Sequence, residues 1–167
     1  QGVGVERVTV PDLHAGRGMD VQDFLMIPVG AKSYAQALDW VCRVRASATA
    51  LCAEAGITTL LADEGGLSPG FETSEEALTL MVKAFERAGL APGKDAAIAL
   101  DIASSSLVNE AGDYPFVRQG RTYSASEMIA LQQAWVADFP IVSIEDGLGE
   151  DDWGNWPAMT AALGRER

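Results

Sequence analysis

Two apolar runs that each end in a carboxylate decide the fold of this chain: Ala96-Ala97-Ile98-Ala99-Leu100-Asp101 and Pro140-Ile141-Val142-Ser143-Ile144-Glu145. Short apolar runs bounded by turn residues are typical of strands that are covered on both faces. A carboxylate at the carboxyl end of such a strand lies at the mouth of an α/β fold, where catalytic groups collect. The two runs therefore predict an α/β sheet with acidic side chains at one edge.

Two further carboxylates, Asp23 and Glu64, also stand where apolar chain turns into loop. Like charges gathered at one edge would repel each other, so their grouping predicts a divalent cation bound among them. From the residues alone, a second interpretation is equally good for Asp101 and Glu145. Each would then be a strand-end carboxylate that caps a helix or pairs with a basic residue.

The composition is that of a soluble globular protein with one domain of ordinary size. The chain has 167 residues, of which 48% are apolar and 22% are charged. Its net charge of −12 and its lack of a Lys/Arg cluster argue against nucleic-acid binding.

The two cysteines and the absence of targeting patterns predict a cytoplasmic location. Cys42 and Cys52 lie on one expected helix without metal-ligand spacing, which favours two buried thiols in a reducing compartment. The chain contains no signal-peptide pattern and no apolar run long enough to span a bilayer. We therefore expect no membrane partner.

The order of elements along the chain predicts a mostly parallel α/β sheet. Strands are expected at residues 7–10 and 24–29 and in the two runs that end at Asp101 and Glu145. Helices are expected from Ser33 to Gly56, from Thr73 or Ser74 to Gly89, from Ser124 or Ser126 through Trp135, and from Asp151 to near Gly164. Two successive helices interrupt the strict alternation. A closed eight-stranded barrel takes ~250 residues, so the order β-β-α-α-β-α-β-α fits half a barrel or a small open sheet.

Four motifs in register give the chain a resemblance to the enolase family. The stretch from His14 to Arg17, followed by Gln22-Asp23-Phe24-Leu25-Met26-Ile27-Pro28, resembles HAxN…QEFMIxP. The family motif DEGGxxP is similar to Asp63-Glu64-Gly65-Gly66-Leu67-Ser68-Pro69. The motif MDxAAS is similar to Leu100-Asp101-Ile102-Ala103-Ser104-Ser105. Ser143-Ile144-Glu145-Asp146-Gly147-Leu148, with Asp152-Trp153 after it, resembles SIEDxxxxxDW. The family's barrel begins β-β-α-α, so the resemblance implies a partial (β/α)8 TIM-type barrel.

The resemblance implies a function and a role for each matched residue. Enolases dehydrate 2-phosphoglycerate with Mg²⁺ in the cytoplasm and act as homodimers. By motif match, Asp101 and Glu145 are metal ligands and Glu64 assists departure of the substrate hydroxyl. Substrate-binding positions of the family are matched by His14, Gln22 and Asp23. Asp23 also matches a catalytic position. The partners implied are a small phosphorylated acid and a second copy of the chain.

The chain departs from the family pattern at several positions. Asp23 stands where the family has glutamate, and losing one methylene moves the carboxylate by about 1 Å, enough to cost on the order of a hundredfold in rate. Arg17 replaces an asparagine, and Ser106-Leu107 replaces glutamate-phenylalanine after the metal aspartate. These changes favour a second interpretation, a diverged paralogue that acts on a phosphonate or carboxyphosphonate. A third is an inactive enolase-like domain that binds a partner.

The resemblance also sets an expectation for domain organisation. Residues 1–167 match the first half of the C-terminal catalytic barrel domain. The N-terminal capping domain, the second half of the barrel, the third metal ligand and the catalytic lysine of the family are not among them. We therefore expect these residues to be a fragment of a longer protein.

Overall fold

A computed structural model describes residues 6–9 (backbone only), 19–62 and 65–164. The predicted site residues His14 and Glu64, and the substituted Arg17, lie outside the described residues. The strands are β1 (Glu6–Thr9), β2 (Asp23–Ile27), β3 (Ala97–Asp101), β4 (Tyr114–Phe116), β5 (Arg121–Tyr123) and β6 (Ile141–Glu145). The α-helices are α1 (Tyr34–Glu54), α2 (Ser74–Arg87), α3 (Ala125–Asp138) and α4 (Trp156–Leu163), and a 3-10 turn spans Ser104–Ser106.

The main sheet has the strand order β1-β2-β3-β6, with β2 antiparallel to both of its neighbours. Only β3 and β6 pair in parallel, so the prediction of a mostly parallel sheet is wrong for the described strands. The reason is the pair of helices between β2 and β3. Each helix reverses the chain direction, so two helices return the chain to the end at which β2 finished, whereas the single helix α3 leads to a parallel strand.

The predicted helix starts are confirmed at three positions. Ser33 caps α1 by accepting the N–H of Gln36 at 3.2 Å. Thr73 and Ser124 begin α2 and α3 with reciprocal capping boxes, in which the glutamate three residues later returns a bond to the cap backbone. The last helix begins at Trp156 rather than at Asp151, because residues 151–155 form turns instead.

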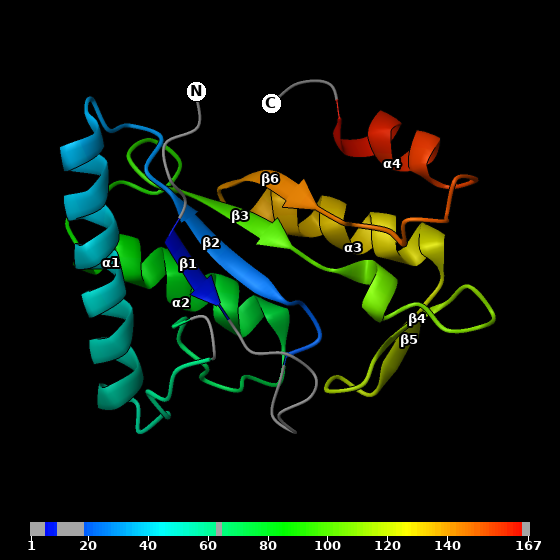
Figure 1. The fold of residues 1–167 in the computed structure, drawn as a ribbon, viewed down its shortest axis with the longest axis horizontal. Helices are drawn as coiled ribbons and strands as arrows, with labels where there is room; N and C mark the ends of the chain where they lie inside the picture. The colour runs from blue at the N-terminus through cyan, green and yellow to red at the C-terminus, as the bar shows by residue number, and fades with distance from the viewer. Residues whose placement is uncertain (1–5, 10–18, 63–64, 165–167) are drawn as a thin grey trace.

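The core lies where α2 and α3 pack against the sheet. Figure 1 shows both helices behind the sheet, with α1 at the left and α4 at the upper right. α1 packs on α2, and α4 contacts α3. The largest fully buried side chains include Phe24, Met26, Phe85, Ile98, Leu100 and Met128. Burial of these apolar groups from both layers holds the strand ends in place.

Three expectations about burial are wrong. The run that forms β6 is not covered on both faces by the described residues, since Val142 is 43% exposed. The segment before Glu64 is not buried chain: Leu60 and Leu61 are 67% and 60% exposed, and Leu61 makes only an isolated bridge to Leu67. Cys52 is buried as predicted, but Cys42 is exposed on the outer face of α1.

A second, two-stranded sheet was not expected from the sequence. β4 and β5 form an antiparallel hairpin between the strand that ends at Asp101 and α3, where the sequence predicted no strand. Tyr114, Phe116 and Tyr123 are buried from this hairpin, and the rings of Phe116 and Tyr123 meet edge to face with centroids 5.0 Å apart. Among the described helices, none combines the length and apolar character needed to cross a membrane.

Candidate active site

Three of the predicted site residues lie in one row at the edge of the main sheet. In the strand register Asp23 is paired with Asp101, and Asp101 is paired with Glu145. Because β2 alone runs in the opposite direction, its first residue lies at the edge where β3 and β6 end. Neighbouring strands are about 4.8 Å apart, so these three side chains are neighbours. We call Asp23, Asp101 and Glu145 the carboxylate row.

The members of the carboxylate row differ in their exposure. Asp23 is 1% exposed, Asp101 is half-buried and Glu145 is exposed. Gln22, the residue before the row, is exposed. Across the described strands the row therefore runs from a buried carboxylate to an exposed one.

The backbone after the row is held in an uncommon conformation. Ala103 and Asp146 are the two non-glycine residues among those described that have positive φ, at 51° and 49°. Each follows a row residue closely, and such conformations persist only where surrounding contacts enforce them. Here the N–H groups of Ile102 and Ser104 bond the carbonyls of Glu145 and Asp146, both at 3.1 Å.

This backbone also orients the middle carboxylate. The N–H of Ala103 donates to Oδ1 of Asp101 at 3.0 Å. The two strand ends are thus cross-linked by backbone hydrogen bonds, and the carboxylate of Asp101 is held by its own turn. Such preorganisation is what a site that binds a metal or a charged substrate requires.

The donor chemistry of the row suits Mg²⁺ as part of a ligand set. Within the described ranges, no group of three or more His, Cys, Asp or Glu side chains is arranged to hold a metal ion. Mg²⁺ is commonly bound in proteins by one or two carboxylates, with water and substrate oxygens in the other positions. Asp101 and Glu145 therefore fit as two ligands, and they do not make a complete site by themselves.

The described residues on either side of residues 63 and 64 are joined by backbone hydrogen bonds. The N–H of Gly65 donates to the carbonyl of Ala62 at 2.8 Å, and the N–H of Ala62 donates to the carbonyl of Gly66 at 2.9 Å. Gly65 has a φ of 84°, a conformation that favours glycine. Arg45 of α1 donates to the carbonyl of Gly65 at 2.8 Å and fixes this turn to the helix. The paired glycines are thus structural at this position.

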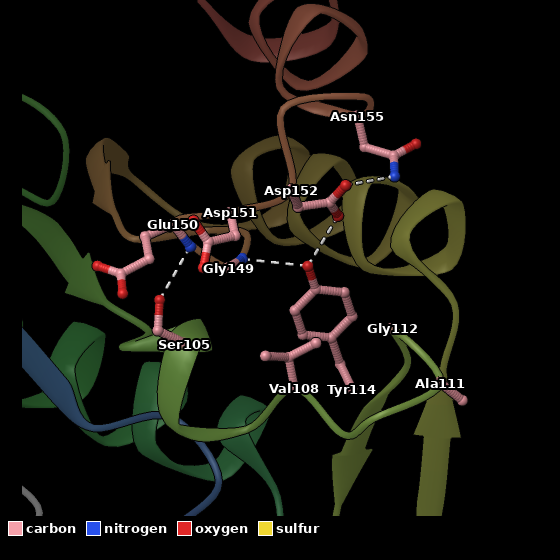
Figure 2. Close-up of a pocket in the computed structure, with 10 residues that line it drawn as sticks. All are labelled: Ser105, Val108, Ala111, Gly112, Tyr114, Gly149, Glu150, Asp151, Asp152 and Asn155. Atoms are coloured by element: carbon pink, nitrogen blue, oxygen red, sulfur yellow. Dashed lines mark hydrogen bonds between the residues drawn. The ribbon is translucent and has the colours of Figure 1, made fainter.

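Beside the row, the loops that follow β3 and β6 enclose a pocket of about 460 Å³ (Figure 2). It is lined by Ser105, Val108, Ala111, Gly112, Tyr114, Gly149, Glu150, Asp151, Asp152 and Asn155, so none of the predicted site residues that the structure describes lines it. Tyr114 is fully buried at the wall of this pocket, and its hydroxyl connects to the loop after β6. It donates to Oδ2 of Asp152 at 2.9 Å and accepts the N–H of Gly149 at 3.1 Å.

Sequence reasoning missed Tyr114, although a signal was present. Tyr114-Pro115-Phe116 and Arg121-Thr122-Tyr123 alternate in side-chain character around Gly120, a pattern that indicates a hairpin. A buried tyrosine normally needs a hydrogen-bond partner for its hydroxyl. The sequence could thus have shown that this ring is buried, but not that its partners come from the loop after β6.

We expect Tyr114→Phe to lower the free energy of unfolding by about 1–3 kcal/mol at neutral pH, because it leaves the buried N–H of Gly149 and the half-buried carboxylate of Asp152 without this partner. Burial raises the pKa of Tyr114 above its ordinary value of 10.0. A raised pKa means that the contribution of the neutral phenol is complete below pH 10 and is lost as the pH rises through the higher folded-state value. The difference between the two proteins should therefore shrink in alkaline urea titrations. A pH-independent difference would contradict this assignment.

The fold and the row together define a class: an α/β protein with acidic side chains from three strands at one edge of its sheet. Residues 3–166 match the family described as "Enolase, C-terminal TIM barrel domain". The chain is 38% identical over 151 residues to a protein named Enolase from Wolinella succinogenes, an alignment that covers 90% of this chain and 36% of that relative. The chain belongs to the enolase family, and the partial TIM-type barrel implied by its motifs is confirmed.

Proposed function

We propose that residues 1–167 form the first half of the catalytic barrel of an enolase-type hydro-lyase, which dehydrates 2-phosphoglycerate to phosphoenolpyruvate. The chain spans 36% of the length of the curated relative, so this activity belongs to a longer polypeptide that contains these residues. The observation that carries the proposal is the register Asp23–Asp101–Glu145. It brings carboxylates from three strands to the edge of the sheet where α/β enzymes place their chemistry.

In this proposal Asp101 and Glu145 hold Mg²⁺. Their carboxylates come from adjacent parallel strands, and the turn at Ala103 keeps Asp101 oriented. When bound, the ion would act as a Lewis acid and stabilise negative charge that develops on the substrate carboxylate. Glu145 lies directly beside Asp101 in the strand register, so both carboxylates can reach one ion.

The other matched residues act on the substrate directly. Glu64 gives a proton to the departing C3 hydroxyl, a role that needs a carboxyl group still protonated near neutral pH. His14 and Gln22 bind the phosphorylated acid. Asp23 lies at the buried end of the row, where it orients the substrate and assists the chemistry as a neighbour of Asp101. The lysine that removes the C2 proton in the family comes from outside residues 1–167.

The proposal extends to assembly and location. We propose that the full protein is a homodimer in the cytoplasm that acts in glycolysis, as the family resemblance implies. Its partners are then a small phosphorylated acid and a second copy of the chain.

The test is formation of phosphoenolpyruvate from 2-phosphoglycerate by the full polypeptide. We expect turnover in the presence of Mg²⁺, complete loss on treatment with EDTA, and recovery when excess Mg²⁺ is returned. Turnover that survives EDTA and dialysis would contradict the role of the carboxylate row. The chelator control is the same EDTA concentration already saturated with Mg²⁺, which should have no effect.

A second candidate function rests on Asp23. The carboxylate of Asp23 is one methylene shorter than that of the family glutamate. Asp23 is only 1% exposed, so its buried side chain cannot shift outward to make up the lost length. This favours a paralogue for a phosphonate or carboxyphosphonate analogue. Comparing kcat/KM for 2-phosphoglycerate with that for its phosphonate analogue separates the two, because the paralogue prefers the analogue.

A further inference from the structure

Asp20 joins two segments that are far apart in the sequence. It lies three residues before Asp23 and is only 5% exposed. Its Oδ1 accepts the N–H of Arg118 at 3.1 Å, and its Oδ2 accepts the N–H of Gln119 at 3.3 Å. The segment that leads into β2 is therefore bonded to the turn of the β4–β5 hairpin.

Arg118 carries the connection to a third segment. Its Nη2 donates to the carbonyl of Gly70 at 2.5 Å. Gly70 is six residues after Glu64, at the end of the glycine-rich segment, and it has a φ of 66°. One residue thus contacts both the segment before Asp23, through its backbone, and the segment after Glu64, through its guanidinium group.

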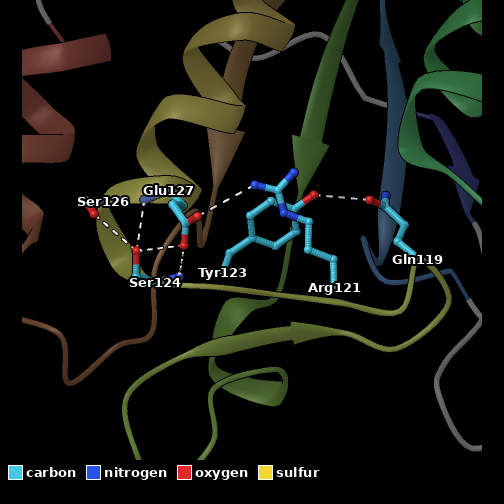
Figure 3. A network of polar contacts seen from close by, with 6 residues as sticks. All are labelled: Gln119, Arg121, Tyr123, Ser124, Ser126 and Glu127. Atoms are coloured by element: carbon cyan, nitrogen blue, oxygen red, sulfur yellow. Dashed lines mark hydrogen bonds and ion pairs between the residues drawn. The ribbon is translucent and has the colours of Figure 1, made fainter.

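The hairpin turn is itself braced against α3, as Figure 3 shows. The hydroxyl of Tyr123 donates to Oε1 of Gln119 at 3.2 Å, and the guanidinium of Arg121 lies 4.3 Å from the centre of the Tyr123 ring. Arg121 also pairs with Glu127 at 3.6 Å, in the capping box of α3. The turn that holds Asp20 and Gly70 is therefore anchored to a helix of the main layer.

We propose that Asp20 and Arg118 are positioning residues, which set the distance between the start of β2, where Gln22 and Asp23 lie, and the loop that carries Glu64. This inference rests on the proposed function for its catalytic consequence. Loss of the precise placement of reacting groups has a large effect, since a displacement of about 1 Å lowers the reaction rate by on the order of a hundredfold. Neither residue belongs to the family motifs quoted above, and neither needs to touch substrate to have this effect.

The test compares Arg118→Ala with Arg121→Ala in the full protein. Arg118→Ala keeps the backbone N–H that bonds Asp20 but removes the bond to Gly70. Arg121→Ala is the matched control, because it removes an arginine of the same hairpin that contacts neither Asp20 nor Gly70. Its pair with Glu127 joins side chains that are 59% and 51% exposed, so its loss should weaken the turn very little. We expect Arg118→Ala to lower kcat 10- to 100-fold, by about the factor that a small displacement costs, with little change in Mg²⁺ affinity. Arg118→Lys, which can still donate to the carbonyl of Gly70, should recover part of the loss.

Hydrogen exchange gives a readout that does not depend on activity. Arg118→Ala should speed amide exchange in residues 65–70, because it removes the bond to Gly70, while residues 19–23 keep their backbone bonds to the hairpin turn. Arg121→Ala should change exchange in neither segment. Unchanged exchange in residues 65–70 of Arg118→Ala overturns the inference, as does an equal fall in kcat for the two variants. If the parent protein lacks dehydratase activity but the exchange result holds, the proposed function fails and the structural link between the two segments stands.

Discussion

Asp101→Asn is expected to abolish tight Mg²⁺ binding and to lower kcat/KM by on the order of a thousandfold, the equivalent of about 4 kcal/mol of transition-state stabilisation. Asparagine has the same shape and keeps the oxygen that accepts the N–H of Ala103. The turn after β3 should therefore survive, and the loss would come from the missing charge. Calorimetric titration with Mg²⁺ and the dehydration assay measure the two effects.

Asp138→Asn is the control for this experiment. It makes the same change of charge at the last residue of α3, away from the row and just before the chain enters β6. We expect it to leave Mg²⁺ affinity and turnover unchanged. If Asp101→Asn binds Mg²⁺ as tightly as Asp138→Asn does, the carboxylate row is not the metal site.

Phe85→Ala should destabilise the fold by about 3–5 kcal/mol, the range for removing a fully buried aromatic ring from a core. Phe85 is 0% exposed on the face of α2 that packs toward the sheet. Its removal leaves a cavity in the core cluster that also contains Phe24 of β2 and Leu100 of β3, the two strands that carry Asp23 and Asp101. Because domains are stable by only about 5–15 kcal/mol, this is a large fraction of the total. Denaturant unfolding at neutral pH measures it.

The neighbouring substitution Glu86→Ala keeps helix propensity the same or better and removes an exposed side chain. We expect it to change stability by less than about 0.5 kcal/mol, as is usual at the surface. Comparable losses for the two variants would mean that α2 is stabilised by its own helical structure and not by packing against the sheet.

Several elements could be predicted because their signals are local. The caps Ser33, Thr73 and Ser124 each satisfy backbone groups within three residues of themselves, so their pattern is readable in the sequence. The strand that ends at Asp101 is an apolar run, and the structure buries it as such.

Other features could not be predicted because they depend on partners far along the chain. The run that forms β6 has the same apolar character as β3, yet Val142 is exposed while Ala97 to Leu100 of β3 are buried, because the cover of a strand face comes from elements elsewhere in the chain. Asp20 gave no signal, since its backbone partners lie 98 and 99 residues away. The buried hydroxyl of Tyr114 is likewise satisfied by Asp152, 38 residues later.

The sequence by itself determined the helix starts, the acidic residues that end two strands and the membership of the enolase family, because these depend on residue type and short spacing. Only the tertiary structure decided that β2 runs against its neighbours. That direction moves Asp23 from the far end of a strand to the place beside Asp101, and it follows from two helices returning the chain to the end where β2 finished. Strand direction is a property of the whole path of the chain, and no local pattern encodes it.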